Sequence, residues 1–190
     1  MSYDWEASGR RFVAVERAFG RPEPVELPLR GRSLYVRGQI DRIDVDGNRT
    51  LVRDLKTGRA HPRVGKEAGP DPVLDVQLAV YALATGRLAA AWQLPPQIGA
   101  AYAFVNRGTE ERDWRRDFEQ TLKPAAEQWL GLAADLLAAR AFPRTPNRDD
   151  CTFCRFTPVC GDAYARARDL LSKGDGVLAR FATLKKVERA

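Results

Sequence analysis

The sequence lacks the segments that several common classes of protein require. It has one histidine among 190 residues. It contains no uncharged apolar run of the ~18 residues that a membrane helix needs, and its polar first residues do not resemble a secretory signal. It also has no internal repeat and no Gly-x4-Gly-Lys-Ser/Thr phosphate loop, so ATP-driven unwinding must come from elsewhere. We therefore expect a cytoplasmic protein without membrane contact.

The composition suits one soluble globular core. The hydrophobic fraction is 44%, and 31 lysines and arginines stand against 25 acidic residues, for a net charge of +6. A mild positive charge favours a polyanionic partner. We expect a core domain over residues 1–150 and a segment with cysteines and basic helices over residues 151–190, packed on the same domain.

A β-hairpin is the clearest local prediction. Residues 33–44 and 50–57 are rich in β-branched and aliphatic side chains, and Asp46-Gly47-Asn48 between them suits a tight turn. If Gly47 and Asn48 form a two-residue loop, Asp46 pairs with Arg49. Counting back along both strands then places position 41 opposite position 54.

Other segments have weaker signals. Asp71 and Pro72 suit the start of a buried helix, as its N-cap and first residue. The remaining expectations are a short helix and extended chain over 5–19, an exposed basic loop over 58–71, a buried strand over 98–105, an amphipathic helix over 124–141, and basic helices over 162–171 and 176–187.

Asp41, Asp54 and Lys56 form the main candidate site. Residues two apart on a strand share a face, so the predicted register places all three side chains together. Two carboxylates can bind a hard cation such as Mg²⁺ that activates water, and a lysine can stabilise developing negative charge. The alternative is that the three side chains are ordinary charged residues on a solvent-exposed face of the sheet. Aspartate is disfavoured inside strands, which argues for the site.

These residues belong to a series of motifs that resembles a known family. The series is Gly38-Gln39-Ile40-Asp41-Arg42-Ile43-Asp44, Asp54-Leu55-Lys56-Thr57-Gly58 and Gln77-x3-Tyr81. It resembles the PD-(D/E)XK nuclease superfamily, and within it the RecB-like branch of AddB-type helicase-nucleases and CRISPR-associated RecB-like exonucleases. The resemblance implies an α/β, restriction-endonuclease-like fold with a mixed central sheet flanked by helices and a C-terminal cysteine-rich, helical segment.

The resemblance also implies roles for individual residues. Asp41 and Asp54 match metal-binding carboxylates for Mg²⁺ or Mn²⁺, with the backbone carbonyl of Leu55 as a further ligand, and Lys56 matches the catalytic lysine. The implied activity is a metal-dependent DNA exonuclease in double-strand-break repair and recombination. Its implied partners are DNA and a helicase domain or subunit of the same complex.

Gln77 and Tyr81 lie one helical turn apart on an otherwise apolar helix. Buried polar groups of this kind need partners. In the family, the matching helix pair supports the catalytic site and contacts DNA.

Cys151, Cys154 and Cys160 fall within ten residues of one another. This spacing is compatible with three free thiols. It is also compatible with a zinc site, in which an aspartate, a histidine or an outside cysteine is the fourth ligand. The trio resembles the three C-terminal ligands of the family's [4Fe-4S] cluster. The family's fourth ligand is an upstream cysteine, which this chain lacks.

The family's first motif is also missing, because its histidine lies upstream of the hairpin. The only histidine, His61, is read as a loop residue or at most a phosphate contact, and Glu16 resembles a glutamate that begins the strand before the second motif. We therefore expect the chain to be the C-terminal part of a larger protein. A catalytically incomplete DNA-binding or scaffolding module is the alternative function.

Two basic stretches are candidate DNA contacts. Residues 58–66 and 112–116 could bind phosphates, and Trp114 could stack on a base. A plain solvated surface is the alternative for both.

Overall fold

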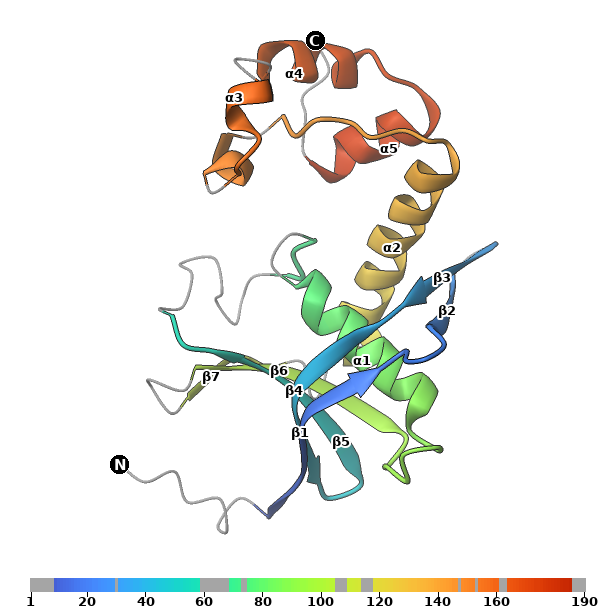
Figure 1. The fold of residues 1–190 in the computed structure, drawn as a ribbon, viewed down its shortest axis with the longest axis vertical. Coiled ribbons are helices and arrows are strands. Elements are labelled where there is room, and N and C mark those ends of the chain that lie inside the picture. Colours follow the sequence, from blue (N-terminus) through green and yellow to red (C-terminus); the bar gives the residue numbers. More distant parts are fainter. Residues whose placement is uncertain are drawn as a thin grey trace. The chain divides into compact units, whose positions relative to one another are not determined.

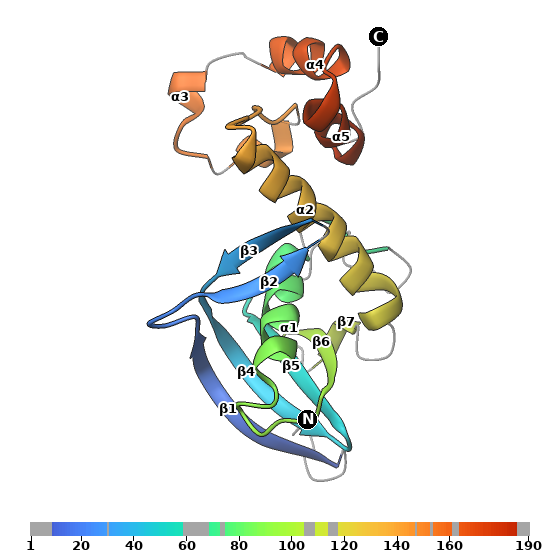
Figure 2. The same cartoon turned by 90° about the vertical axis from the view of Figure 1, so that its right-hand side faces the viewer.

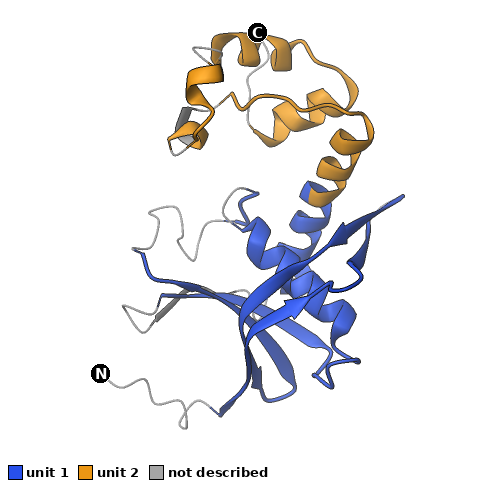
Figure 3. Cartoon of the chain, in the orientation of Figure 1, with its two compact units in different colours: residues 1–129 blue, residues 130–190 orange. Residues whose placement is uncertain are grey.

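The computed structural model describes residues 9–29, 31–58, 69–72, 75–104, 109–113, 118–146, 148–152, 154–160 and 164–185, with backbone only for 109–113 and 148–149. The chain divides into two compact units, residues 1–129 and 130–190 (Figure 3). The expected division at residue 150 stays a prediction.

A five-stranded mixed sheet is the centre of the first unit, with strand order β1-β4-β5-β6-β7 (Figure 1). Its strands are β1 (Arg10–Phe19), β4 (Gly38–Asp46), β5 (Arg49–Lys56), β6 (Gln97–Phe104) and β7 (Thr109–Asp113). Strands β5 and β6 are parallel, and the other neighbours are antiparallel. This arrangement confirms the predicted α/β class with a mixed central sheet.

The helix α1 (Val76–Leu88) connects β5 to β6 and packs against the central sheet (Figure 2). It also contacts β2 (Val25–Leu29), which pairs with β3 (Arg32–Val36) in a separate two-stranded sheet. Strand β2 buries alternate residues, as a strand with one covered face does. The fully buried large apolar side chains of this unit come from β4, β5, α1 and the turn before α2: Ile40, Ile43, Leu51, Val52, Leu78 and Leu122.

The predicted hairpin register is confirmed. Asp46 pairs with Arg49, and the pairing continues to Arg42 opposite Arg53. Gly47 has φ of +59°, a left-handed conformation that glycine adopts without steric cost. The turn therefore sets the register that the carboxylate positions require.

Three local predictions need correction. The extended chain expected within residues 5–19 is confirmed by the strand over 10–19, which pairs along β4 with one irregularity after Phe12, while residues 5–8 of the expected helix lie outside the described residues. The single strand expected over 33–44 is divided between β3 and β4, which belong to separate sheets. The helix α1 begins at Val76 rather than after Asp71. Asp75 is fully buried, accepts the backbone N–H of Asp71 on its carboxylate at 2.7 Å, and donates its own N–H to the carbonyl of Asp71 at 2.8 Å. These bonds join Asp71 to the residue that directly precedes the helix.

A buried ionic network joins β4 and β5. Asp44 is fully buried, and both of its carboxylate oxygens accept the Nε–H of Arg42, at 2.9 and 3.0 Å. The Arg53 Nη1 lies 3.6 Å from Asp44 Oδ2, and the ring of Phe12 lies 5.4 Å from the Arg42 guanidinium. Since neighbouring residues on a strand face opposite ways, this network lies behind Asp41 and Asp54.

Removing Asp44 should strongly destabilise the protein. Asp44→Ala leaves Arg53, which is 3% exposed, without this carboxylate. Breaking a buried pair in this way costs about 3–5 kcal/mol of unfolding free energy. Chemical denaturation measures the loss, with Glu119→Ala as the control. Glu119 forms an exposed pair with Lys123, so its removal should cost less than about 1 kcal/mol. Equal losses would contradict the prediction.

The second unit is helical. The helix α2 (Lys123–Ala138) begins in the first unit after a π-helical turn and continues into the second. Arg180 and Asp135 form an ion pair at 2.5 Å, and Lys185 and Asp150 form another at 2.6 Å. The three predicted helices of this region are confirmed with shifted ends. The described residues form α2, a 3₁₀ turn (Arg148–Cys151), α3 (Thr157–Cys160), α4 (Tyr164–Ser172) and α5 (Gly176–Leu184). Among the described residues, no helix combines the length and apolar character that crossing a bilayer requires.

Candidate active site

Asp41 lies where the pairing of β4 with β5 ends. The last paired residues are Arg42 and Arg53. One residue further, Asp41 Oδ2 accepts the backbone N–H of Leu55 at 2.8 Å. A carboxylate thus replaces a backbone carbonyl as the partner of β5, which holds Asp41 beside Asp54.

Asp54 is a buried carboxylate next to a half-buried lysine. It is 1% exposed, and Lys56 Nζ lies 2.5 Å from its Oδ2 as an ion pair. Burial raises the pKa of Asp54, Lys56 opposes that rise, and the negative charge of Asp41 adds to it. The structure therefore brings Asp41, Asp54 and Lys56 together, as the hairpin register predicted. Their catalytic roles stay a prediction.

Tyr102 is a neighbour of this group that the sequence did not indicate. It pairs with Asp54 across the parallel strands β5 and β6, and its ring is buried. Lys56 Nζ lies 5.5 Å from the ring centroid. For this segment the sequence predicted only a buried apolar strand. It did not place Tyr102 beside Asp54, because no local turn sets the register of two parallel strands.

Gln77 and Tyr81 contact each other on α1. The Gln77 amide donates a hydrogen bond to the Tyr81 hydroxyl at 2.8 Å. Tyr81 is buried and packs edge to face against Phe19, with ring centroids 6.1 Å apart, whereas Gln77 is exposed. The expected pairing is observed, and its role in catalysis stays a prediction.

A model of the PD-(D/E)XK nuclease superfamily matches residues 2–161, which is most of the chain. The chain belongs to the PD-(D/E)XK nuclease superfamily. It is thus a nuclease by family, with a restriction-endonuclease-like fold, and the activity of the family is phosphodiester hydrolysis. No curated protein matches the chain.

PD-(D/E)XK nucleases usually use divalent metal ions, and Asp41 and Asp54 fit such an ion. Both are carboxylates, the ligands that hard cations prefer. Burial and the charge of Asp41 disfavour the ionised form of Asp54. A divalent cation would offset both effects, because it attracts the two negative charges at once.

The three cysteines are not gathered into a metal-binding group among the residues that the structure describes. Cys151 is half-buried, and Cys154 and Cys160 are exposed and not disulfide-bonded. In the described part of the chain, no three side chains of histidine, cysteine, aspartate or glutamate are placed to hold a metal ion. The structure therefore gives no support to an iron-sulfur cluster on these thiols, and the cluster stays a prediction of the family resemblance.

Glu16 lies in β1 of the nuclease and has a left-handed backbone, with φ of +50°. This conformation is uncommon for a residue with a side chain. Its carboxylate accepts a hydrogen bond from the Gln39 amide, two residues before Asp41.

Some predicted sites of the nuclease fall outside the described residues. These are residues 59–66 of the basic loop, which include His61, and residues 114–116, which include Trp114. Arg112 is described by its backbone alone, so its predicted phosphate contact stays a prediction.

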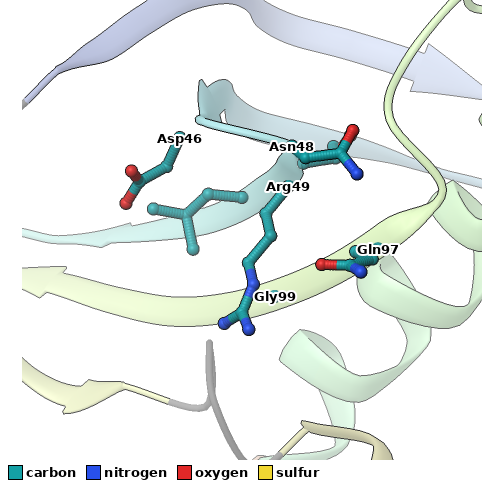
Figure 4. Close-up of a pocket in the computed structure, with 7 residues that line it drawn as sticks. Asp46, Asn48, Arg49, Gln97 and Gly99 are labelled. Carbon is teal, nitrogen blue, oxygen red and sulfur yellow. The ribbon is translucent and has the colours of Figure 1, made fainter.

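A pocket of about 580 Å³ lies at the opposite end of the hairpin from Asp54 (Figure 4). Arg49 and the amides of Asn48 and Gln97 line it, together with Asp46. Only one carboxylate is present there, so the pocket lacks the paired ligands of the site at Asp41 and Asp54.

Replacing Asp54 should stabilise the metal-free nuclease. Because the pKa of Asp54 is raised, the folded state holds its proton more tightly than the unfolded chain does. Its contribution to stability therefore falls as the pH rises from below the ordinary aspartate range through the raised pKa. At neutral pH with a chelator, Asp54→Asn should raise the unfolding temperature, by about 2–4 °C for each kcal/mol released.

The matched control is Asp169→Asn, which removes a carboxylate from an exposed pair with Lys173. Its unfolding temperature should stay close to that of the wild type. The gain of Asp54→Asn over the wild type should also shrink as the pH falls. An unfolding temperature below that of the wild type at neutral pH would contradict the prediction.

Proposed function

We propose that the chain is the nuclease domain of a Mg²⁺-dependent DNA exonuclease. The observation that carries this proposal is the meeting of Asp41, Asp54 and Lys56 where β4 and β5 stop pairing. Membership of the nuclease superfamily supports the reaction class. The resemblance of the motifs to the RecB-like branch supports exonuclease action within a helicase-nuclease for double-strand-break repair.

Asp41, Asp54 and the backbone carbonyl of Leu55 would hold the Mg²⁺ ion. When bound, such an ion polarises phosphoryl oxygens and lowers the pKa of an attacking water. The hydrogen bond from the Leu55 N–H fixes one oxygen of Asp41. This bond limits the conformations of the Asp41 carboxylate, so little ordering would remain when an ion binds.

Lys56 acts on the water and on the developing charge. Its side chain is 40% exposed, so its ammonium can reach a bound phosphodiester. An ammonium in this position orients the attacking water and stabilises negative charge in the transition state. The ion pair with Asp54 holds Lys56 near the reaction before substrate binds.

Gln77 and Tyr81 would support the site from α1. The amide of Gln77 is exposed, and its hydrogen bond to the Tyr81 hydroxyl limits the orientations that it adopts. An exposed, oriented amide can contact the DNA backbone. The net charge of +6 favours the same polyanionic partner.

Removing the ammonium of Lys56 should abolish most cleavage. Lys56→Ala should lower kcat by about 100-fold or more, the usual cost of losing a charge-stabilising group. The substrates are end-labelled linear DNA and a closed circle, each with and without Mg²⁺. An exonuclease degrades the linear DNA alone. Lys123→Ala, which removes an exposed lysine paired with Glu119, is the control and should match the wild type.

Each result separates the proposal from its alternative. If Lys56→Ala cleaves DNA at the wild-type rate, the assignment of Lys56 as the catalytic lysine is wrong. DNA binding that is equal with and without Mg²⁺, together with no cleavage by any form of the chain, would identify a DNA-binding or scaffolding module instead. Cleavage of the closed circle would exclude strict exonuclease action.

The iron-sulfur cluster is a separate prediction that rests on the family resemblance alone. If Cys151, Cys154 and Cys160 bind it with an outside fourth ligand, the chain purified without oxygen should contain iron and absorb visible light. Cys154→Ser should lose both signals. Bound zinc without visible absorption, or no bound metal, would reject the cluster.

A further inference from the structure

The ring of Tyr102 lies under the ammonium of the proposed catalytic lysine. Tyr102 is 4% exposed, and Lys56 Nζ lies 5.5 Å from its ring centroid. A cation at this distance from an aromatic face is attracted by the negative face of the ring. Tyr102 also pairs with Asp54 on the neighbouring strand, so the backbone holds it beside the site.

Lys56 has two observed attractions, and a metal ion on Asp54 would compete for only one of them. Its ammonium contacts the carboxylate of Asp54 and the face of Tyr102. A divalent ion on Asp54 would take the charge that Lys56 pairs with. Without that ion pair, the flexible lysine side chain can adopt many conformations, and fixing one of them has an entropic cost. The ring of Tyr102 is neutral, so a metal ion does not compete for it.

We propose that Tyr102 is a positioning residue that holds the Lys56 ammonium at the reacting phosphate once Asp54 binds metal, an inference that rests on the proposed function. Tyr102 itself takes no part in the chemistry. Its ring acts through Lys56, so its loss lowers kcat and leaves KM unchanged. The competing explanation is that Tyr102 only fills the core.

The face of the ring is tested by one variant that keeps the ring and one that removes it. Tyr102→Phe retains the ring and should keep kcat close to that of the wild type. Tyr102→Leu removes the ring and should lower kcat by about 3- to 30-fold, the value of a cation–π contact, with KM unchanged. Phe118→Leu, which removes a buried ring elsewhere in the same unit, should leave kcat unchanged.

Fluorinated phenylalanines at position 102 provide a second test that does not depend on the folding of Tyr102→Leu. Fluorine weakens the negative face of the ring while its shape changes little, so kcat should fall stepwise with fluorination. The unfolding temperature measured with a chelator checks that every member of the series is folded. A kcat that is independent of fluorination would overturn the inference.

The two proposals fail in different ways. If the wild type cleaves DNA and Lys56→Ala does not, the proposed function stands, and equal kcat for Tyr102→Phe and Tyr102→Leu rejects the role of Tyr102 alone. If Lys56→Ala cleaves like the wild type, the assignment of Lys56 is wrong, and the role of Tyr102 is wrong with it.

Discussion

The register between β4 and β5 is the constraint on which the candidate site depends. A slip of one residue would turn Asp41 or Asp54 to the other face of the sheet. Three features hold the register. The turn at Gly47 sets it at one end, the buried Asp44 network holds the middle, and the bond from Leu55 to Asp41 ends it at the site.

The sheet separates charges by face. Asp44 and its arginines are paired behind the site, where the pairing stabilises the fold. Asp41 and Asp54 are close together in front, where burial and repulsion make the charged form of Asp54 costly. A cation site needs negative charge that the protein itself does not neutralise. If every carboxylate were already paired with a lysine or an arginine, a cation would gain little by binding. Stability and proposed function therefore oppose each other at Asp54.

Much of this organisation follows from local signals in the sequence. The turn residues and the strand period predicted the pairing of Asp46 with Arg49, and with it the approach of Asp41 to Asp54. Helical spacing predicted that Gln77 and Tyr81 are neighbours. These predictions hold because each depends on residues that are close in the chain and on a fixed backbone period.

Only the tertiary structure decided the features that depend on distant segments. Tyr102 lies beside Asp54 because α1 and the parallel pairing of β5 with β6 place it there, and no turn encodes that register. The helix α1 begins after Asp75 because that buried carboxylate bonds to the backbone of Asp71. The sequence by itself determined the hairpin and its carboxylates through local geometry, and long-range packing, which a local pattern does not contain, decided what surrounds them.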